Sequence, residues 1–115
     1  MRKSLTRKER LKKKDEFQRV FRSPTQFSCA GAKLALASNS LDNSRLGVGL
    51  SKKFGNAVER NRAKRQVREI FRLHKQRVKP GFDLVFLIFP GHFSYADREK
   101  QYLSLLRRSQ AASAY

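Results

Sequence analysis

The chain has 115 residues, enough for one domain, with a formal net charge of +18 and an isoelectric point near 11.2. Its 39% hydrophobic content and nine Phe exclude a wholly disordered chain, and its single cysteine excludes an internal disulfide and a cysteine-based zinc site. No apolar run approaches the roughly 20 residues of a membrane span. The single cysteine favours a reducing cytoplasm, and the net charge favours a polyanion as partner, with nucleic acid ahead of an anionic membrane surface.

The distribution of charged and apolar residues predicts three segments. Residues 1–14 hold eight Lys or Arg and one Glu, which favours a flexible basic N-terminal arm. Residues 15–108 contain the periodic apolar patterns and are predicted to form a single domain. Residues 109–115, with the sequence SQAASAY, are expected to form a frayed C-terminal tail.

The first predicted element is a short helix. Asp15 suits a helix start, and Phe17, Val20 and Phe21 follow at helical spacing. Pro24 then ends the helix, because proline cannot continue it.

Two strands are predicted next. The sequence AKLALAS, residues 32–38, alternates with Leu34 and Leu36 on one face, and the sequence NSLDNS after it has turn chemistry. The following sequence RLGVGLS places apolar side chains on one face and Gly47 and Gly49 on the other. A strand face made of glycine allows another group to approach closely.

A longer helix and a buried strand come after these. Asn56 and Glu59 form a capping-box pattern before a helix that we expect to extend to about Gln76. The sequence FDLVFLIF, residues 82–89, is apolar apart from Asp83. Such a continuous run is typical of an interior strand that is buried on both faces.

A second capping pattern at Ser94 opens a last helix through about Arg108. The residues alone therefore give the order α-β-β-α-β-α, with room for one more short strand near Phe27. This order predicts an α+β sandwich of a sheet against helices.

The longer helix carries a segregated basic face. Residues 52–72 hold eight Lys or Arg and two Glu. At 100° per residue, apolar residues such as Val67 and Ile70 fall on one side. A separate stripe about 100° wide collects Asn61, Lys64, Arg65, Arg68 and Arg72. A solvated face would mix acids and bases, whereas this row holds no acid and suits a phosphate backbone.

Other functional classes find less support. A protein nuclease needs a cluster of carboxylates or histidines, and the nine acids are scattered, so we predict no catalytic and no metal-binding residue. A helix-turn-helix DNA binder needs a second helix beside the basic one, but strand-like segments flank it. A membrane-surface helix needs Trp or a Leu-rich face, which this helix lacks. A ribosomal or RNA-assembly protein without enzymatic role fits the bulk composition equally well.

The basic helix carries a specific resemblance. The sequence SKKFGNAVERNRAKRQVREIFR closely resembles the signature of the bacterial ribonuclease P protein subunit, whose Arg-Asn-Arg box matches Arg60-Asn61-Arg62. The upstream sequence RLKKKDEFQRVF also matches, and the likeness spans about residues 10–108.

The resemblance implies the fold α-β-β-β-α-β-α, similar to a domain of ribosomal protein S5, with a left-handed βαβ crossover. Handedness rules alone predict a right-handed one. It also implies that the chain binds a large catalytic RNA and precursor tRNA, with no membrane or DNA partner. The RNA removes the 5′ leader of the tRNA with Mg²⁺ that the RNA subunit mainly binds, and the protein supplies no catalytic residue.

The resemblance also assigns residue roles. A cleft between the first helix and the sheet holds the leader, lined by Lys13, Phe17 and Phe21, and each Phe ring is expected to pack one edge on the sheet. Ala35 stands where some family members place an aromatic side chain in this cleft. The resemblance places seven residues against RNA, namely Lys53, Arg60, Asn61, Arg62, Lys64, Arg65 and Arg68, and the basic surface read from the residues adds Lys52 and Arg72 to the expected RNA contacts.

Overall fold

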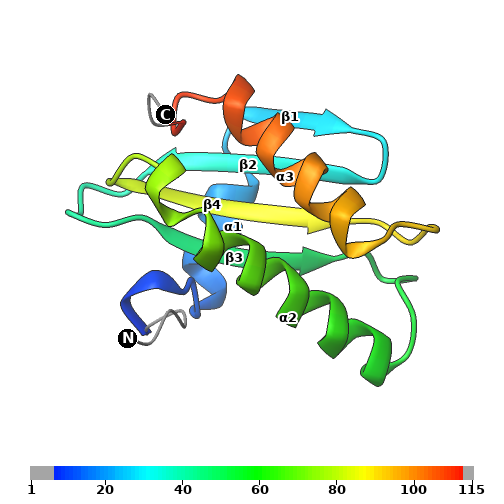
Figure 1. The fold of residues 1–115 in the computed structure, drawn as a ribbon. Coiled ribbons are helices and arrows are strands. Elements are labelled where there is room, and N and C mark those ends of the chain that lie inside the picture. Colours follow the sequence, from blue (N-terminus) through cyan, green and yellow to red (C-terminus); the bar gives the residue numbers. More distant parts are fainter. Residues whose placement is uncertain (1–6, 113–115) are drawn as a thin grey trace.

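The computed structural model describes residues 7–112 (Figure 1). Its order confirms the fold that the resemblance implies, including the short strand near Phe27. The elements are the 3-10 turn η1 Arg7–Glu9, α1 Lys14–Phe21, β1 Gln26–Cys29, β2 Ala32–Ser38, β3 Arg45–Leu50, α2 Ala57–Leu73, the 3-10 turn η2 Lys75–Arg77, β4 Phe82–Ile88 and α3 Tyr95–Arg108.

The four strands form one sheet in the order β1-β2-β4-β3. The β1–β2 and β2–β4 pairs are antiparallel, and β3 and β4 are parallel. In Figure 1, α2 and α3 lie in front of the sheet and α1 lies behind it. The continuously apolar β4 is interior and buried on both faces, as predicted.

The β3-α2-β4 crossover is left-handed. In Figure 1, β3 and β4 both point to the right, β4 lies above β3, and α2 passes in front of them. Followed along the strands, the chain turns anticlockwise as it advances. The handedness that the resemblance implies is confirmed, and the general expectation of a right-handed crossover is wrong here. A right-handed crossover would place α2 on the α1 side and separate its apolar face from that of α3.

The predicted capping signals are present at both long helices. The Asn56 side chain accepts from the Glu59 amide at 2.9 Å, and the Glu59 carboxylate accepts from the Asn56 amide at 3.1 Å. Ser94 and Asp97 form the same arrangement before α3. The α2 helix ends at Leu73, before the predicted end, because the chain leaves helical geometry at the next residue and forms η2.

Two apolar cores lie on opposite faces of the sheet. The larger one is made by the sheet with α2 and α3. The smaller one, under α1, consists of Leu11, Val20, Ala35 and Val85. The predicted glycine face of β3 lies on this side and allows Phe17 to approach closely, since a Cβ at Gly47 would lie 3.0 Å from the Phe17 ring.

Both chain ends differ from the sequence prediction. The amide of Leu11 donates to Leu46 at 2.9 Å and the Leu11 side chain is buried, which corrects the predicted arm for residues 7–14. Ala111 is fully buried and its carbonyl accepts from the Lys79 amide at 2.7 Å, which corrects the predicted frayed tail for residues 109–112. The reason is the same at both ends, because Leu11 packs in the smaller core and Ala111 packs in the larger one. The rest of both predictions, residues 1–6 and 113–115, lies outside the described residues.

The largest buried side chain is Tyr102, whose hydroxyl has no hydrogen-bond partner among the described residues. Its ring packs edge-on against Phe86, with ring centroids 5.5 Å apart. Burial of the hydroxyl raises the Tyr102 pKa. Because an unpaired buried hydroxyl costs about 1–3 kcal/mol, Tyr102→Phe should keep or raise the free energy of unfolding, as urea denaturation would measure. A loss above about 1 kcal/mol would show that the hydroxyl has a partner.

Candidate nucleic-acid interface

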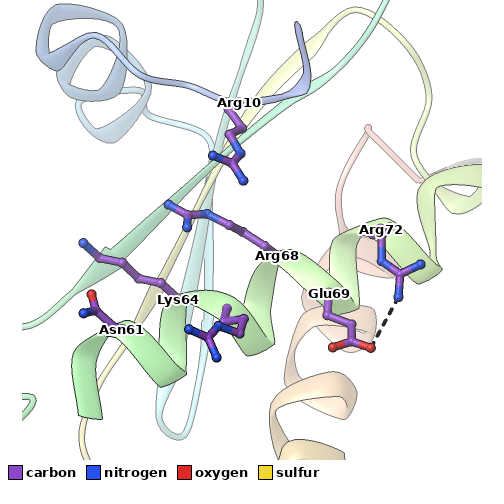
Figure 2. A pocket seen from close by; sticks show the side chains of 7 residues that line it. Arg10, Asn61, Lys64, Arg68, Glu69 and Arg72 are labelled. Atoms are coloured by element: carbon purple, nitrogen blue, oxygen red, sulfur yellow. Dashed lines mark hydrogen bonds and ion pairs between the residues drawn. The ribbon is translucent and has the colours of Figure 1, made fainter. Parts of the chain in front are cut away.

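A groove of about 470 Å³ runs along α2 (Figure 2). We call it the basic groove. All five members of the row predicted from helical spacing line it, so the structure brings this row together on one surface. The residues that line the basic groove are Arg10, Asn61, Lys64, Arg65, Arg68, Glu69 and Arg72.

The charges in the basic groove favour an anion. Its one lining acid, Glu69, already accepts from Arg72 at 3.3 Å. In Figure 2, Arg10 points from the N-terminal segment toward Arg68. The pKa of Arg68 is lowered, first by burial and then by the charge of Arg10. A phosphate between these two guanidinium groups would relieve their repulsion and offer each of them bidentate contacts.

Arg10 is the groove residue that sequence reasoning missed. It was assigned to the flexible arm because its neighbours are basic. In the structure it forms a bridge with Leu46 of β3, next to the buried Leu11. Leu11, the one apolar residue between Arg7 and Lys14, was the available signal that this part of the segment docks.

The predicted RNA-contact residues outside the row point in other directions. Arg60 turns back toward the end of β3, where it donates to the Ser51 carbonyl at 3.0 Å. Arg62 is exposed on another side of α2 and lines a different pocket. Lys52 and Lys53 are exposed in the turn before α2. The Arg-Asn-Arg box therefore presents its three side chains to three different places.

A second hollow of about 370 Å³ lies among the N-terminal segment, β3 and α2, and we call it the cleft. It shares Arg10, Lys64 and Arg68 with the basic groove, so the two are adjacent and have these cations in common. The remaining residues that line the cleft are Leu11, Lys12, Phe17, Leu46, Gly47 and Val48.

The three residues predicted for the leader cleft are placed differently from one another. Phe17 is half-buried and lines the cleft. Phe21 is 39% exposed and does not line it, although its ring centroid lies 6.3 Å from that of Phe17. Lys13 is exposed, and its neighbour Lys12 lines the cleft instead. Ala35 is buried beneath α1 with Val85, so its methyl group is part of the small core.

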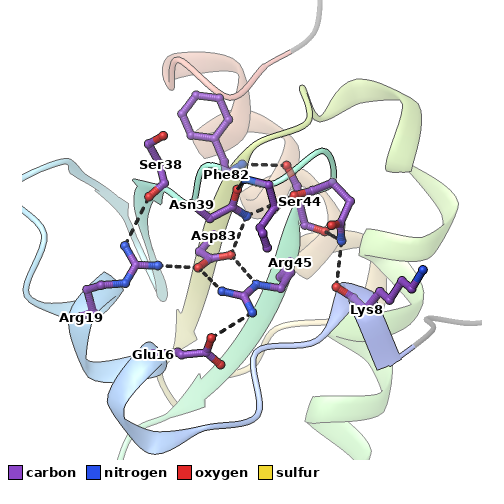
Figure 3. A network of polar contacts seen from close by, with 11 residues as sticks. Lys8, Glu16, Arg19, Ser38, Asn39, Ser44, Arg45, Phe82 and Asp83 are labelled. Atoms are coloured by element: carbon purple, nitrogen blue, oxygen red, sulfur yellow. Dashed lines mark hydrogen bonds and ion pairs between the residues drawn. The ribbon is translucent and has the colours of Figure 1, made fainter.

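A buried ion network holds α1 against the sheet (Figure 3). The Asp83 carboxylate has no exposed surface and accepts from both Arg45 and Arg19. Arg45 reaches Asp83 at 2.7 and 2.8 Å and donates to Glu16 of α1 at 2.9 Å. These two carboxylates raise the pKa of Arg45, with Asp83 the larger cause. The sequence marked Asp83 as the exception in an apolar strand but could not identify its partners.

Within residues 7–112, no helix is long and apolar enough to cross a bilayer. In the same part of the chain, no three His, Cys, Asp or Glu side chains gather where they could hold a metal ion. His74 pairs with Glu99 at 2.8 Å.

Comparisons with known proteins point in one direction. The family described as Ribonuclease P matches residues 5–110. The ribonuclease P protein component of Clostridioides difficile (strain 630) is 32% identical over 102 residues, which cover 86% of this chain and 90% of that protein. Ribonuclease P protein structures from Staphylococcus aureus and Thermotoga maritima have the same α+β fold. The first has a TM-score of 0.81 and 27% identity, covering 91% of this chain and 98% of that chain. The second has a TM-score of 0.77 and 32% identity, covering 89% and 98%.

Proposed function

The chain belongs to the ribonuclease P protein family, which implies partnership with the ribonuclease P RNA in an endoribonuclease complex, and we propose that it binds that RNA and the 5′ leader of precursor tRNA. In this proposal the RNA subunit carries the chemistry and the protein works in the cytoplasm on tRNA maturation. The protein's part is binding and orientation.

One observation carries the proposal: the basic groove and the cleft share Arg10, Lys64 and Arg68. The cations of the basic groove suit a phosphate backbone, and such contacts do not depend on the base sequence of the RNA subunit. The cleft adds the ring of Phe17, on which a leader base can stack regardless of its identity. Shared cations would hold the leader and the RNA subunit against each other.

The Mg²⁺ that the resemblance implies is assigned to the RNA subunit. Mg²⁺ is held in proteins by oxygen ligands, of which one or two are usually carboxylates. The one carboxylate in the lining of the groove and the cleft, Glu69, already accepts from Arg72. Asn61 offers one amide oxygen among cations. These residues do not fit a metal site held by the protein, so we assign no protein ligand to the ion.

Reconstitution tests the proposal. The protein is mixed with a bacterial ribonuclease P RNA and precursor tRNA at low magnesium, where the RNA alone is a poor catalyst. We expect the protein to restore cleavage at the 5′ end of the mature tRNA. A ribosomal or RNA-assembly protein would bind RNA without restoring specific leader cleavage, so failure to restore it would favour that alternative.

Leader binding makes a separate prediction at Phe17. A stacked base contributes about 1–3 kcal/mol, so Phe17→Ala should weaken binding of precursor tRNA by the reconstituted complex about 5- to 150-fold. Affinity for mature tRNA should stay unchanged, because it has no leader to stack. Phe89→Ala, at an exposed side chain outside the cleft, is the matched control. An equal loss for both tRNAs, or a collapsed thermal melt, would make Phe17 a core residue only.

A further inference from the structure

A third hollow, of about 250 Å³, lies between α2 and the start of α3, on the side of the sheet opposite α1. We call it the aromatic pocket. Three aromatic side chains from two segments, the turn before α2 and the residues around the start of α3, reach it, together with two arginines and an amide. The residues that the argument uses are Phe54, Arg62, Gln66, Phe93, Tyr95 and Arg98.

The aromatic rings on one wall are fixed before any ligand arrives. The Arg98 guanidinium lies 4.5 Å from the centroid of Phe93 and 5.9 Å from that of Phe54. Arg98 is itself anchored, since it donates to the carbonyl of Phe89 at 2.7 Å and to that of Gly31 at 2.9 Å. A preformed wall loses little conformational entropy when a flat ligand binds to it.

The pocket is also lined by two arginines, Arg62 and Arg98, against one acid, Glu59. Arg98 is 4% exposed, and its hydrogen-bond partners among the described residues are uncharged oxygen atoms. Burial lowers the pKa of this guanidinium. Arg62 is exposed at the rim. The lining acid Glu59 is engaged in capping α2 through the amide of Asn56. Flat aromatic surface beside two arginines matches a base and its phosphate.

We propose that the aromatic pocket receives one unpaired nucleobase of the ribonuclease P RNA, stacked by Tyr95 and Phe93, with its phosphate at Arg62. This inference rests on the proposed function and extends it to a second surface. The size fits one base, because pockets for larger ligands span about 300–1,000 Å³. The occupant is the RNA subunit and not the leader, because the cleft proposed for the leader shares no lining residue with the aromatic pocket. Residues of the same helix, α2, line both the basic groove and the aromatic pocket, so one RNA can reach both.

Tyr95→Leu in the full chain tests the stacking. We expect affinity for the ribonuclease P RNA to fall about 5- to 150-fold, which corresponds to one stacked base. The dependence of affinity on salt should keep its slope, because no phosphate contact is removed. Tyr95→Phe keeps the ring and should bind like the wild-type protein. Leu41→Ala, an exposed apolar change in the β2–β3 turn, is the matched control and should have no effect.

Base-specific chemical probing supplies the second readout. At saturating protein, dimethyl sulfate should leave at least one unpaired base of the RNA protected by the wild type and reactive with Tyr95→Leu. Thermal melts of both proteins separate a binding loss from a folding loss. Equal affinity and equal reactivity for the two proteins would overturn the inference, as would a loss seen equally with Tyr95→Phe. If the wild-type protein restores cleavage but Tyr95→Leu matches it in every readout, only this inference fails and the proposed function stands.

Discussion

Replacing Asp83 with Ala should lower the free energy of unfolding by about 3–5 kcal/mol. The carboxylate is fully buried and forms ion pairs with both Arg45 and Arg19. Its removal leaves Arg45, whose side chain is only 17% exposed, with Glu16 as its remaining ion partner. Small domains are stable by about 5–15 kcal/mol in total, so this protein with its charge of +18 would be close to unfolding.

Urea denaturation of the wild-type protein and the Asp83→Ala variant measures this difference in the free energy of unfolding. Glu16→Gln is the matched control, because it removes the more exposed partner of the same arginine and should cost at most about 1 kcal/mol. The Asp83→Ala substitution should also release α1 from the sheet. Limited proteolysis should then cut a larger fraction of the protein near the start of α1. If Asp83→Ala and Glu16→Gln cost the same small amount, the network does not hold α1 on the sheet.

The second large effect concerns RNA binding. The double substitution of Lys64 and Arg68 by Ala should lower the slope of log K against log salt concentration by about two units for the ribonuclease P RNA. Hydrogen bonds to charged groups contribute about 1.5–3 kcal/mol each, so affinity should fall at least about a hundredfold. Both residues line the basic groove and the cleft, and neither belongs to an apolar core.

A matched control removes the same charge elsewhere. Arg77 and Lys79 are exposed and do not line the groove or the cleft. Their double substitution by Ala should change the slope by less than about half a unit, and thermal melts should be alike for both variants. Equal slopes for the two double variants would mean that RNA binding follows net charge and not this surface.

Local patterns predicted most of the fold. Caps such as Asn56 with Glu59 depend on residues three positions apart, so the sequence displays them completely. The alternation of Leu34 and Leu36 likewise identified the buried face of β2. The handedness of the crossover came only from the family resemblance, because it depends on where the apolar face of α3 packs, far along the chain.

The site was predictable where it lies on one helix and not where distant segments meet. The row from Asn61 to Arg72 follows from helical spacing alone. Arg10 joins that row only because Leu11 docks on β3, which no local pattern states. The same limit applies to Asp83, whose arginine partners come from α1 and β3. It also applies to Arg62, which follows Asn61 in the sequence but lines the aromatic pocket together with residues of α3.

The strand order has a consequence for how the chain folds during synthesis. Because β4 is the last strand to be made but lies between β2 and β3, the sheet cannot assemble before Phe82–Ile88 is available. Until then the chain can form the β1–β2 hairpin, while β3 has no strand partner and α2 has no complete sheet to cover. Such non-local pairing slows folding, because the loop must close before its contacts form. The nascent protein should therefore leave the ribosome almost complete before it folds, and then fold in one cooperative step.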